Sequence, residues 1–184
     1  MKNKIVFVLI FFICHGSLCA NAQNIEFHNS ERDEFVTNEI IYSLLKIKGV
    51  DQLDNTSESV VFYHQQLDGF VFVTCVNNGN TLPYLTIVSP CTYRHSGQLM
   101  WYDFRYLGDV APFMVANYAM KSSRKVKVLY EEQDGQVNFW IDIPLLRTSE
   151  FATQFEQCLK DIKGAKKAFM DMVQILTPDF TDVN

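Results

Sequence analysis

The sequence predicts an α+β fold in which helices pack on an antiparallel sheet. Three short runs rich in β-branched and aromatic residues follow one another between residues 59 and 89, and two more flank an Asp-Gly pair at residues 134–135. Segments with apolar residues at every third or fourth position precede, separate and follow these runs. The resulting order is helix, three-strand meander, helix, β-hairpin and long C-terminal helix, which is typical of the α+β class because adjacent strands joined by short turns pair antiparallel.

The first expected element is a helix that ends near Gly49. Ser30–Asp33 has the form of a capping box, which starts helices, and glycine often ends them. The apolar residues that follow at helical spacing are Phe35, Ile40, Ile41, Leu44, Leu45 and Ile47. The polar stretch Asp51–Ser57 is expected to be a loop.

An antiparallel meander of three strands is predicted next. The first two strands are Ser59–Gln65 and Phe70–Val76, and Leu67-Asp68-Gly69 supplies the turn between them. A third runs from Pro83 to Ser89. Because proline has no backbone N–H, we expect Pro83 at the start of its strand or on an edge of the sheet.

The segment Cys91–Gly108 fits two interpretations. Its aromatic and apolar residues alternate as in a strand, although the segment could equally begin a helix. The alternating residues are Met100, Tyr102, Phe104 and Tyr106. A helix from about Val110 to Lys121 is expected after it, with Asp109 as the N-cap.

The C-terminal part predicts a hairpin followed by a long helix. Lys125–Glu132 and Gln136–Ile143 flank Asp134-Gly135, a strong hairpin signal. Thr148 or Ser149 is expected to cap a helix that Pro178 terminates. Its apolar stripe consists of Phe151, Phe155, Cys158, Leu159, Ile162, Ala165, Phe169, Met172, Val173 and Leu176.

The N-terminus has the pattern of a secretory signal peptide. Lys2 and Lys4 precede the apolar run Ile5–Cys14, and residues 20–22 have the A-x-A form of a cleavage site. We therefore expect a signal peptide over residues 1–22, a single domain over residues 23–184 with its core at about 30–176, and an exported protein, either in the bacterial periplasm or secreted. The alternative is a lipoprotein signal with Cys19 lipidated, although Leu18 is bulkier than the small residue expected before such a cysteine.

Composition excludes several classes of partner. The 184-residue chain has a formal net charge of −5 at pH 7 and is 14% aromatic, which favours a packed core over disorder. A mildly acidic chain without a long basic run is not expected to bind nucleic acid. Beyond the signal, no apolar run approaches the roughly 20 residues that span a bilayer, so we expect no membrane span after signal cleavage.

The sequence predicts neither a catalytic site nor a metal or cofactor site. His28, His64 and His95 form no H-x-x-x-H pair, and the chain has no C-x-x-C or G-x-S-x-G motif. His64 lies in the first strand, whose alternation favours an outward direction. Four lysines of the last helix are expected to form a solvated basic face opposite the apolar stripe, or to meet an acidic partner. They are Lys160, Lys163, Lys166 and Lys167.

Three cysteines remain after the signal, so at least one is an unpaired thiol or forms an intermolecular bridge. A hairpin centred near Gly79 sets Cys75 against the neighbourhood of Pro83, so the register argues against a Cys75–Cys91 disulfide. Cys158 belongs to the apolar stripe and is expected in the core.

The candidate partner-binding residues lie in the 93–106 segment. They are Tyr93, Arg94, Trp101, Tyr102 and Arg105. Tyrosine, tryptophan and arginine dominate interface hot spots, and an irregular connection is a common place to display them. In the alternative interpretation, Trp101 and Phe104 cap the end of the sheet.

From residue 31 to residue 173 the chain resembles the YbjN-like family, which shares the fold of type III secretion chaperones. The resemblance rests on the order of elements and on short motifs, namely Lys46-Ile47-Lys48-Gly49, Asp68-Gly69 with Phe70-Val71-Phe72-Val73, Val115-Ala116-Asn117-Tyr118, Lys125-Val126-Lys127-Val128 and Asp134-Gly135. It implies a small, dimeric binding protein without known catalysis or cofactor. We therefore expect an exported, non-enzymatic domain that holds a protein or peptide partner on an apolar sheet surface or on the 93–106 segment, with a homodimer among its states.

Two other classes remain open. A secreted cystatin-like protease inhibitor would also pack a helix on an antiparallel sheet, but its Q-x-V-x-G hairpin is absent, because Phe139 and Trp140 follow Gln136-Val137-Asn138. A hydrolase with an unrecognised site would require residues that only the tertiary fold brings together.

Overall fold

The computed structural model describes residues 33–77, 79, 82–105, 112–113, 115–117 and 125–176. The expected signal peptide and Asp109 lie outside these residues. The elements are α1 (Asn38–Ile47), β1 (Asp51–Asn55), β2 (Val60–His64), a 3₁₀ turn (Gln65–Leu67), β3 (Gly69–Val76), β4 (Tyr84–Pro90), β5 (Thr92–His95), β6 (Gln98–Trp101), β7 (Lys127–Glu131), β8 (Gln136–Pro144) and α3 (Thr148–Leu176).

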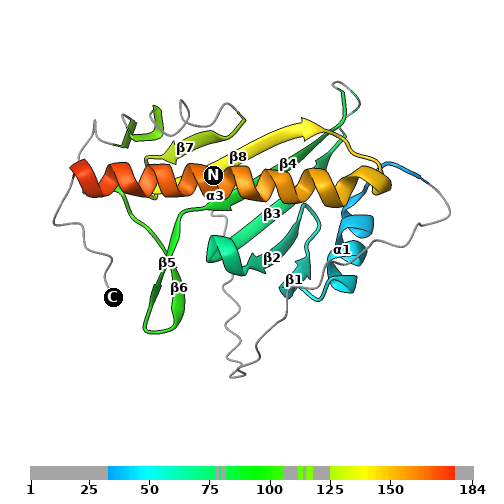
Figure 1. Ribbon diagram of the computed structural model, residues 1–184, viewed down its shortest axis with the longest axis horizontal. Helices are drawn as coiled ribbons and strands as arrows, with labels where there is room; N and C mark the ends of the chain where they lie inside the picture. Colours follow the sequence, from blue (N-terminus) through cyan, green and yellow to red (C-terminus); the bar gives the residue numbers. More distant parts are fainter. Residues whose placement is uncertain are drawn as a thin grey trace, which may run out of the picture.

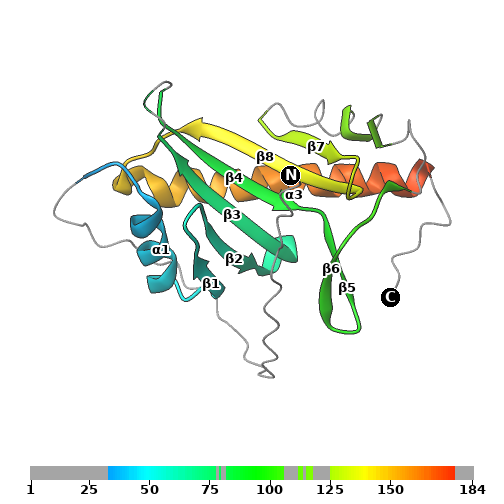
Figure 2. The same cartoon turned by 180° about the vertical axis from the view of Figure 1, so that it is seen from behind.

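The predicted α+β class is confirmed. Six antiparallel strands form one sheet in the order β1-β2-β3-β4-β8-β7, with α1 before it and α3 after it. The helix α3 crosses one face of this sheet, in front of it in Figure 1 and behind it in Figure 2. The helix α1 is tied to α3 by the Lys48–Glu156 ion pair at 3.0 Å.

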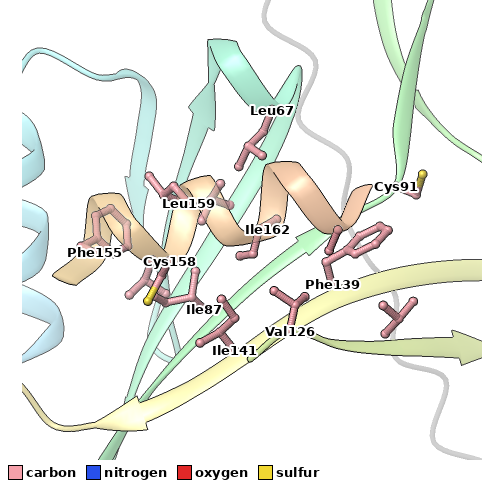
Figure 3. Packing of buried hydrophobic residues seen from close by; sticks show 14 of the residues in the cluster. Leu67, Ile87, Cys91, Val126, Phe139, Ile141, Phe155, Cys158, Leu159 and Ile162 are labelled. Carbon is pink, nitrogen blue, oxygen red and sulfur yellow. The ribbon is translucent and has the colours of Figure 1, made fainter. Parts of the chain in front are cut away.

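The core lies between α3 and the sheet, where the predicted apolar stripe is buried. Its buried members are Phe151, Phe155, Cys158, Leu159, Ile162, Ala165, Phe169 and Val173. They meet every second residue of the strands, including Ile87, Phe139 and Ile141 (Figure 3). Burial of these side chains is the main free-energy gain of the fold.

The helix α1 begins later than the sequence predicts. Its N-cap is Thr37, whose hydroxyl accepts a hydrogen bond from the N–H of Ile40 at 3.3 Å, so a start at Ser30–Asp33 is wrong. Asp33 instead reaches the start of α3. There its carboxylate accepts hydrogen bonds from the N–H of Ser149 at 3.3 Å and from its hydroxyl at 2.8 Å. Asp33, which is remote in sequence, therefore caps α3 by accepting a backbone N–H that has no partner within the first turn of the helix.

The expected loop at Asp51–Ser57 is wrong for its first part, which forms the edge strand β1. The ladder with β2 is irregular between Asp51 and Asp54, and Gln52 has a positive φ of 51°. Polar side chains and a bulge are common on sheet edges because they discourage pairing with another chain. Those same features concealed the strand in the sequence.

The meander β2–β3–β4 and the hairpin β7–β8 are confirmed. In the β3–β4 ladder Cys75 is opposite Leu85, two residues from the predicted neighbourhood. All three cysteines of the described chain are thiols. Pro83 directly precedes β4, as expected for a residue without an N–H, and its carbonyl accepts the N–H of Leu145 at 3.2 Å.

The ambiguous segment after Cys91 forms a hairpin, β5–β6, which leaves the large sheet after β4 (Figures 1 and 2). Ser96 and Gly97 make its turn and both have positive φ values, 50° and 80°, as in type I′ turns. Residues 112–113 and 115–117 are helical, within the range of the predicted second helix.

Candidate interaction surface

The root of the β5–β6 hairpin is fixed to the core. The Thr92 hydroxyl donates to the carbonyl of Asp68 at 2.9 Å, and the N–H of Cys91 donates to the carbonyl of Val137 at 2.8 Å. An isolated two-stranded hairpin is only marginally stable in water. These bonds therefore let the ribbon project from the sheet while keeping its orientation.

An aromatic chain runs from the hairpin into the core. The rings of Tyr93 and Tyr102 lie 4.7 Å apart, those of Tyr102 and Phe104 5.3 Å, and those of Phe104 and Phe169 5.2 Å. Tyr102 and Phe104 are buried. Two of the predicted partner-binding residues, Tyr93 and Tyr102, thus belong to the contact between the hairpin and α3.

Arg105 is held against the β7–β8 turn. Its guanidinium pairs with the carboxylate of Asp103 and donates to the carbonyl of Gln133 at 3.2 Å. The N–H of Phe104 donates to the carbonyl of Gly135 at 2.8 Å, and a Cβ atom at residue 135 would collide with the Asp103 carboxylate. Gly135, with a φ of 66°, permits this close approach.

Trp101 and its neighbour Met100 are the large apolar side chains that the hairpin exposes. Both are 42% exposed. Trp101 is opposite Thr92 and Met100 is opposite Tyr93, so the two side chains leave opposite faces of the ribbon. The register sets Arg94 opposite Leu99. Of the five candidate residues, Tyr93 and Tyr102 are therefore turned to the core, whereas Trp101 is turned to solvent.

A second surface lies on the sheet face turned away from α3, which we call the distal face. One residue of each strand lies in a single row across it, and the row reads Asp54, Val61, Phe72, Val88, Trp140 and Lys127 from β1 to β7. Its four apolar members are half-buried. Figure 2 views the sheet from this side, and no helix of the described chain lies over it. The sequence predicted an apolar sheet surface as one possible binding site without specifying its residues, and both alternating sets in Phe70–Val76 are largely apolar.

Asp142 organises the polar end of the distal face. Its carboxylate accepts hydrogen bonds from Thr86 at 2.8 Å, Trp140 at 2.5 Å and Lys127 at 2.9 Å. Burial raises the pKa of this carboxyl, but the three hydrogen bonds outweigh burial and hold the pKa below its usual value. Asp142 is therefore charged at neutral pH and orients the Trp140 ring.

Lys166 does not belong to a solvated basic face. Its ammonium enters the contact between α3 and the sheet, donates to the hydroxyl of Ser89 at 3.0 Å and lies 5.9 Å from the centre of the Phe139 ring. Burial lowers its pKa. Lys160, Lys163 and Lys167 are exposed, as the sequence predicts.

The Ser89–Lys166 pair has the residue types of a serine nucleophile and its base, but its geometry differs from such a site. Ser89 is fully buried and donates its own hydroxyl proton to the carbonyl of Phe70 at 3.0 Å. A nucleophile must instead give its proton to the base and face the substrate. Nearby, His64 is half-buried on the α3 side rather than turned outward; burial lowers its pKa, and Lys163 and Lys166 lower it further.

A hollow of about 350 Å³ lies between the start of α3 and the end of β8. Lys125 and Asp161 flank it, 3.8 Å apart, and the Cys158 thiol forms part of its wall. Burial, together with the charge of Asp161, raises the pKa of Cys158 to about 11. The thiol is therefore protonated at neutral pH, and the thiolate is the nucleophilic form.

No group of three or more His, Cys, Asp and Glu side chains in the described residues could hold a metal ion. No helix within the same residues is long and apolar enough to cross a membrane. No protein-family model matches the chain, and no curated protein matches it. What the surfaces can do is therefore argued from their geometry, and two of them, the β5–β6 hairpin and the distal face, expose apolar side chains on rigid strands.

Proposed function

We propose that this protein is an exported, non-enzymatic domain that binds a protein or peptide, and that its fold is of the YbjN-like and type III secretion chaperone-like kind. The observation that carries the proposal is the β5–β6 hairpin. It exposes Met100 and Trp101 from a root that the core holds in place.

Large apolar side chains on a rigid ribbon favour recognition of another polypeptide. Tryptophan and methionine are enriched at protein interfaces, because each covers a large apolar area. The ordering cost of binding is small here, because Thr92 and Cys91 already fix the root of the ribbon. The exposed side chains point to both sides of the ribbon, which suits a partner that wraps around it.

The backbone of the hairpin offers a second mode of contact. β5 and β6 form a two-stranded sheet, so in the described part of the chain no further strand pairs with either outer edge. An extended peptide can add to such an edge through main-chain hydrogen bonds, and side-chain pockets then supply specificity. An apolar strand that needs protection from aggregation would fit this surface.

The N-terminal pattern supports an extracytoplasmic site of action. Lys2 and Lys4, the apolar run Ile5–Cys14 and the A-x-A sequence at residues 20–22 make up a secretory signal. The partner would then be a polypeptide present in the periplasm or outside the cell.

Replacement of both Met100 and Trp101 by Ala tests the proposal. The exported protein would be cross-linked in its native envelope fraction, and its partners would be captured and identified. We expect the double variant to lose a partner that the wild-type protein retains, with an unchanged thermal midpoint. Phe113→Ala is the matched control, because Phe113 is 46% exposed outside both surfaces and the hairpin residues are each 42% exposed.

Two outcomes would contradict the proposal. Retention of the same partners by the double variant would place binding elsewhere. A fall in the thermal midpoint without loss of the partner would show that Met100 and Trp101 serve the fold.

A further inference from the structure

The strand β8 extends beyond its neighbour β7. The ladder between them ends at Lys127 and Trp140, whereas β8 continues to Pro144 and is still paired with β4 there (Figures 1 and 2). The hollow beside α3 lies at this step, since Ile141 and Ile143 of β8 form part of its wall. A short stretch of β8 is therefore flanked, within the described chain, by a cavity instead of a strand.

The backbone of Asp142 turns one donor and one acceptor toward this cavity. In an antiparallel sheet, the N–H and the C=O of a residue point to the same neighbouring strand, and those of the next residue point to the other one. The carbonyl of Val137 accepts the N–H of Cys91, and the N–H of Leu145 donates to the carbonyl of Pro83, so odd-numbered residues of β8 point to β4. Asp142 therefore points to the β7 side, where no described residue bonds its N–H or its C=O.

This edge is one residue long. Pro144, the next residue that points the same way, has no N–H, and Trp140 before it pairs with Lys127. A peptide strand that adds to a sheet uses a run of main-chain groups, whereas one donor and one acceptor match a single amino-acid unit. The volume of the hollow, about 350 Å³, is also at the lower end of the range of about 300–1,000 Å³ found for ligand pockets.

Two opposite charges flank the same hollow. The Lys125 ammonium and the Asp161 carboxylate are 3.8 Å apart, and their side chains are 70% and 23% exposed. An ion pair with an exposed member contributes little stability, so opening it for a ligand costs little. Asp161 also accepts a hydrogen bond from the Gln157 amide at 2.9 Å, which holds the carboxylate beside the cavity. The hollow thus presents a cation and an anion side by side, as the recognition of a zwitterion requires.

The rest of the wall is apolar or uncharged. Cys158 and Ile141 are buried, Ile143 is half-buried, and Gln154 adds an exposed amide. The carboxylate of Asp142 is already bound by three donors on the distal face. An apolar side chain would therefore find contacts in the hollow, whereas a further charge would find no partner there among the described residues.

We propose that this hollow binds a free α-amino acid with an apolar side chain. The ammonium of the ligand pairs with Asp161, its carboxylate pairs with Lys125 and the N–H of Asp142, and its side chain lies against Ile143 and Cys158. The site belongs to β8 and α3, whereas the proposed polypeptide-binding surface is the β5–β6 hairpin. The inference therefore goes beyond the proposed function and does not depend on it.

Isothermal titration calorimetry of the exported protein with L-leucine tests the site. We expect a dissociation constant of about 1 mM or lower. N-acetyl-leucine lacks the ammonium, leucinamide lacks the carboxylate and glycine lacks the apolar side chain, so each should bind at least about tenfold more weakly. Because the end of a peptide keeps only one of the two charges, the same analogues distinguish a free amino acid from a peptide terminus.

Crossing the analogues with two variants assigns each charged contact. Asp161→Asn should weaken leucine binding by about tenfold and should no longer distinguish leucine from N-acetyl-leucine. Lys125→Gln should weaken it similarly and should no longer distinguish leucine from leucinamide. Asp171→Asn and Lys167→Gln are the matched controls, because they remove an exposed ion pair elsewhere on α3 and should leave the affinity unchanged. The analogues test the site on the wild-type protein even where a variant folds poorly.

Thiol labelling locates the bound ligand. Saturating leucine should slow the modification of Cys158 by methyl methanethiosulfonate, followed for each cysteine by mass spectrometry. It should leave the rate at Cys75 unchanged, since Cys75 does not line the hollow. Cys75 is a suitable internal control because burial raises the pKa of both thiols to about 11.

Three outcomes would overturn the inference. The first is the absence of leucine binding to the wild-type protein at about 10 mM, ten times the expected constant. The second is equal affinity for leucine, N-acetyl-leucine and leucinamide, which would mean that the site reads neither charge. The third is leucine binding that leaves the labelling of Cys158 unchanged, which would place the ligand elsewhere.

Discussion

The two faces of the sheet are made from alternate residues of the same strands, and they differ in what covers them. On β8, Phe139 is fully buried beneath α3, whereas the next residue, Trp140, is half-buried on the distal face and hydrogen-bonded to Asp142. Both positions are aromatic. The comparison teaches that apolar character alone does not identify the core of this protein, because a second apolar surface lies on the other side of the same strands.

The covered face is also the more constrained of the two. The rings of Phe139 and Phe169 meet edge to face at 5.7 Å. Other buried members of the α3 stripe, including Phe155 and Ile162, pack on the same face of the sheet (Figure 3). On the distal face, the polar contacts of Trp140, Lys127 and Thr86 converge on one carboxylate. Packing therefore orders one face, and a small hydrogen-bonded group orders the other.

The largest expected effect on stability comes from substituting two adjacent residues of β8, one on each face of the sheet. Phe139→Ala should lower the free energy of unfolding by about 3–5 kcal/mol, because it leaves a cavity under α3. Trp140→Ala should cost about 1 kcal/mol, since it loses one hydrogen bond and half-buried area. Urea titration at a concentration where the protein is monomeric measures both. Equal costs would mean that the distal face is as tightly packed as the covered one.

A smaller effect concerns Lys166, whose charged side chain lies at the covered face of the sheet. Burial lowers the pKa of Lys166, so the folded state favours the neutral amine and the wild-type protein should gain stability as the pH rises toward the usual lysine range. Lys166→Met should raise the free energy of unfolding at pH 7 by up to about 1 kcal/mol. That gain should shrink as the pH approaches 10.

Thermal unfolding between pH 7 and pH 10 measures this difference. Lys160→Met on the exposed side of α3 is the control and should give no gain. A loss of stability in Lys166→Met at pH 7 would show that the hydrogen bond to Ser89 outweighs burial of the charge.

The smallest expected effect concerns the Asp33 carboxylate that caps the start of α3, as distinct from the apolar stripe that packs α3 on the sheet. The hydrogen bond from the Ser149 hydroxyl lowers the pKa of Asp33, so its stabilisation is present above the ordinary carboxyl range and is lost as the pH falls through the lowered pKa. Asp33→Ala should lower the thermal midpoint modestly at pH 7, and the difference should vanish in acid.

Differential scanning calorimetry at pH 7 and in acid checks this expectation. Asp171→Ala, on the last turns of α3, is the control, and Asp33→Asn should retain part of the cap. A difference between wild type and Asp33→Ala that stays constant with pH would place the effect in the uncharged contacts of this segment.

Local patterns predicted those elements whose burial follows a simple period. The apolar stripe of α3 and the β7–β8 hairpin at Asp134-Gly135 could be read directly, because steps of three and four residues, or an Asp-Gly turn between alternating runs, each specify one local structure. The strand β1 could not, since an edge strand needs no apolar side chains. The start of α1 was misplaced because Ser30–Asp33 has a capping pattern, but Asp33 caps a helix more than one hundred residues later.

The candidate surface was predictable only in part. Composition drew attention to the 93–106 segment, but the direction of each side chain depends on the β5–β6 register. That register buries Tyr102 and exposes Trp101. Lys166 shows the same limit, because its spacing on α3 matches the exposed lysines and only the contact with Ser89 reveals its burial.

By itself, the sequence determined the α+β class, the order of most elements and the residues of the long apolar stripe, because local backbone preference and periodic burial act over a few residues. Only the tertiary structure decided which strands are neighbours and which helix each polar residue caps. It also placed Asp54 and Lys127 at the two ends of one continuous row. The physical reason is register. A strand's side chains are assigned to a face and to partners only when its hydrogen bonds to distant strands are made.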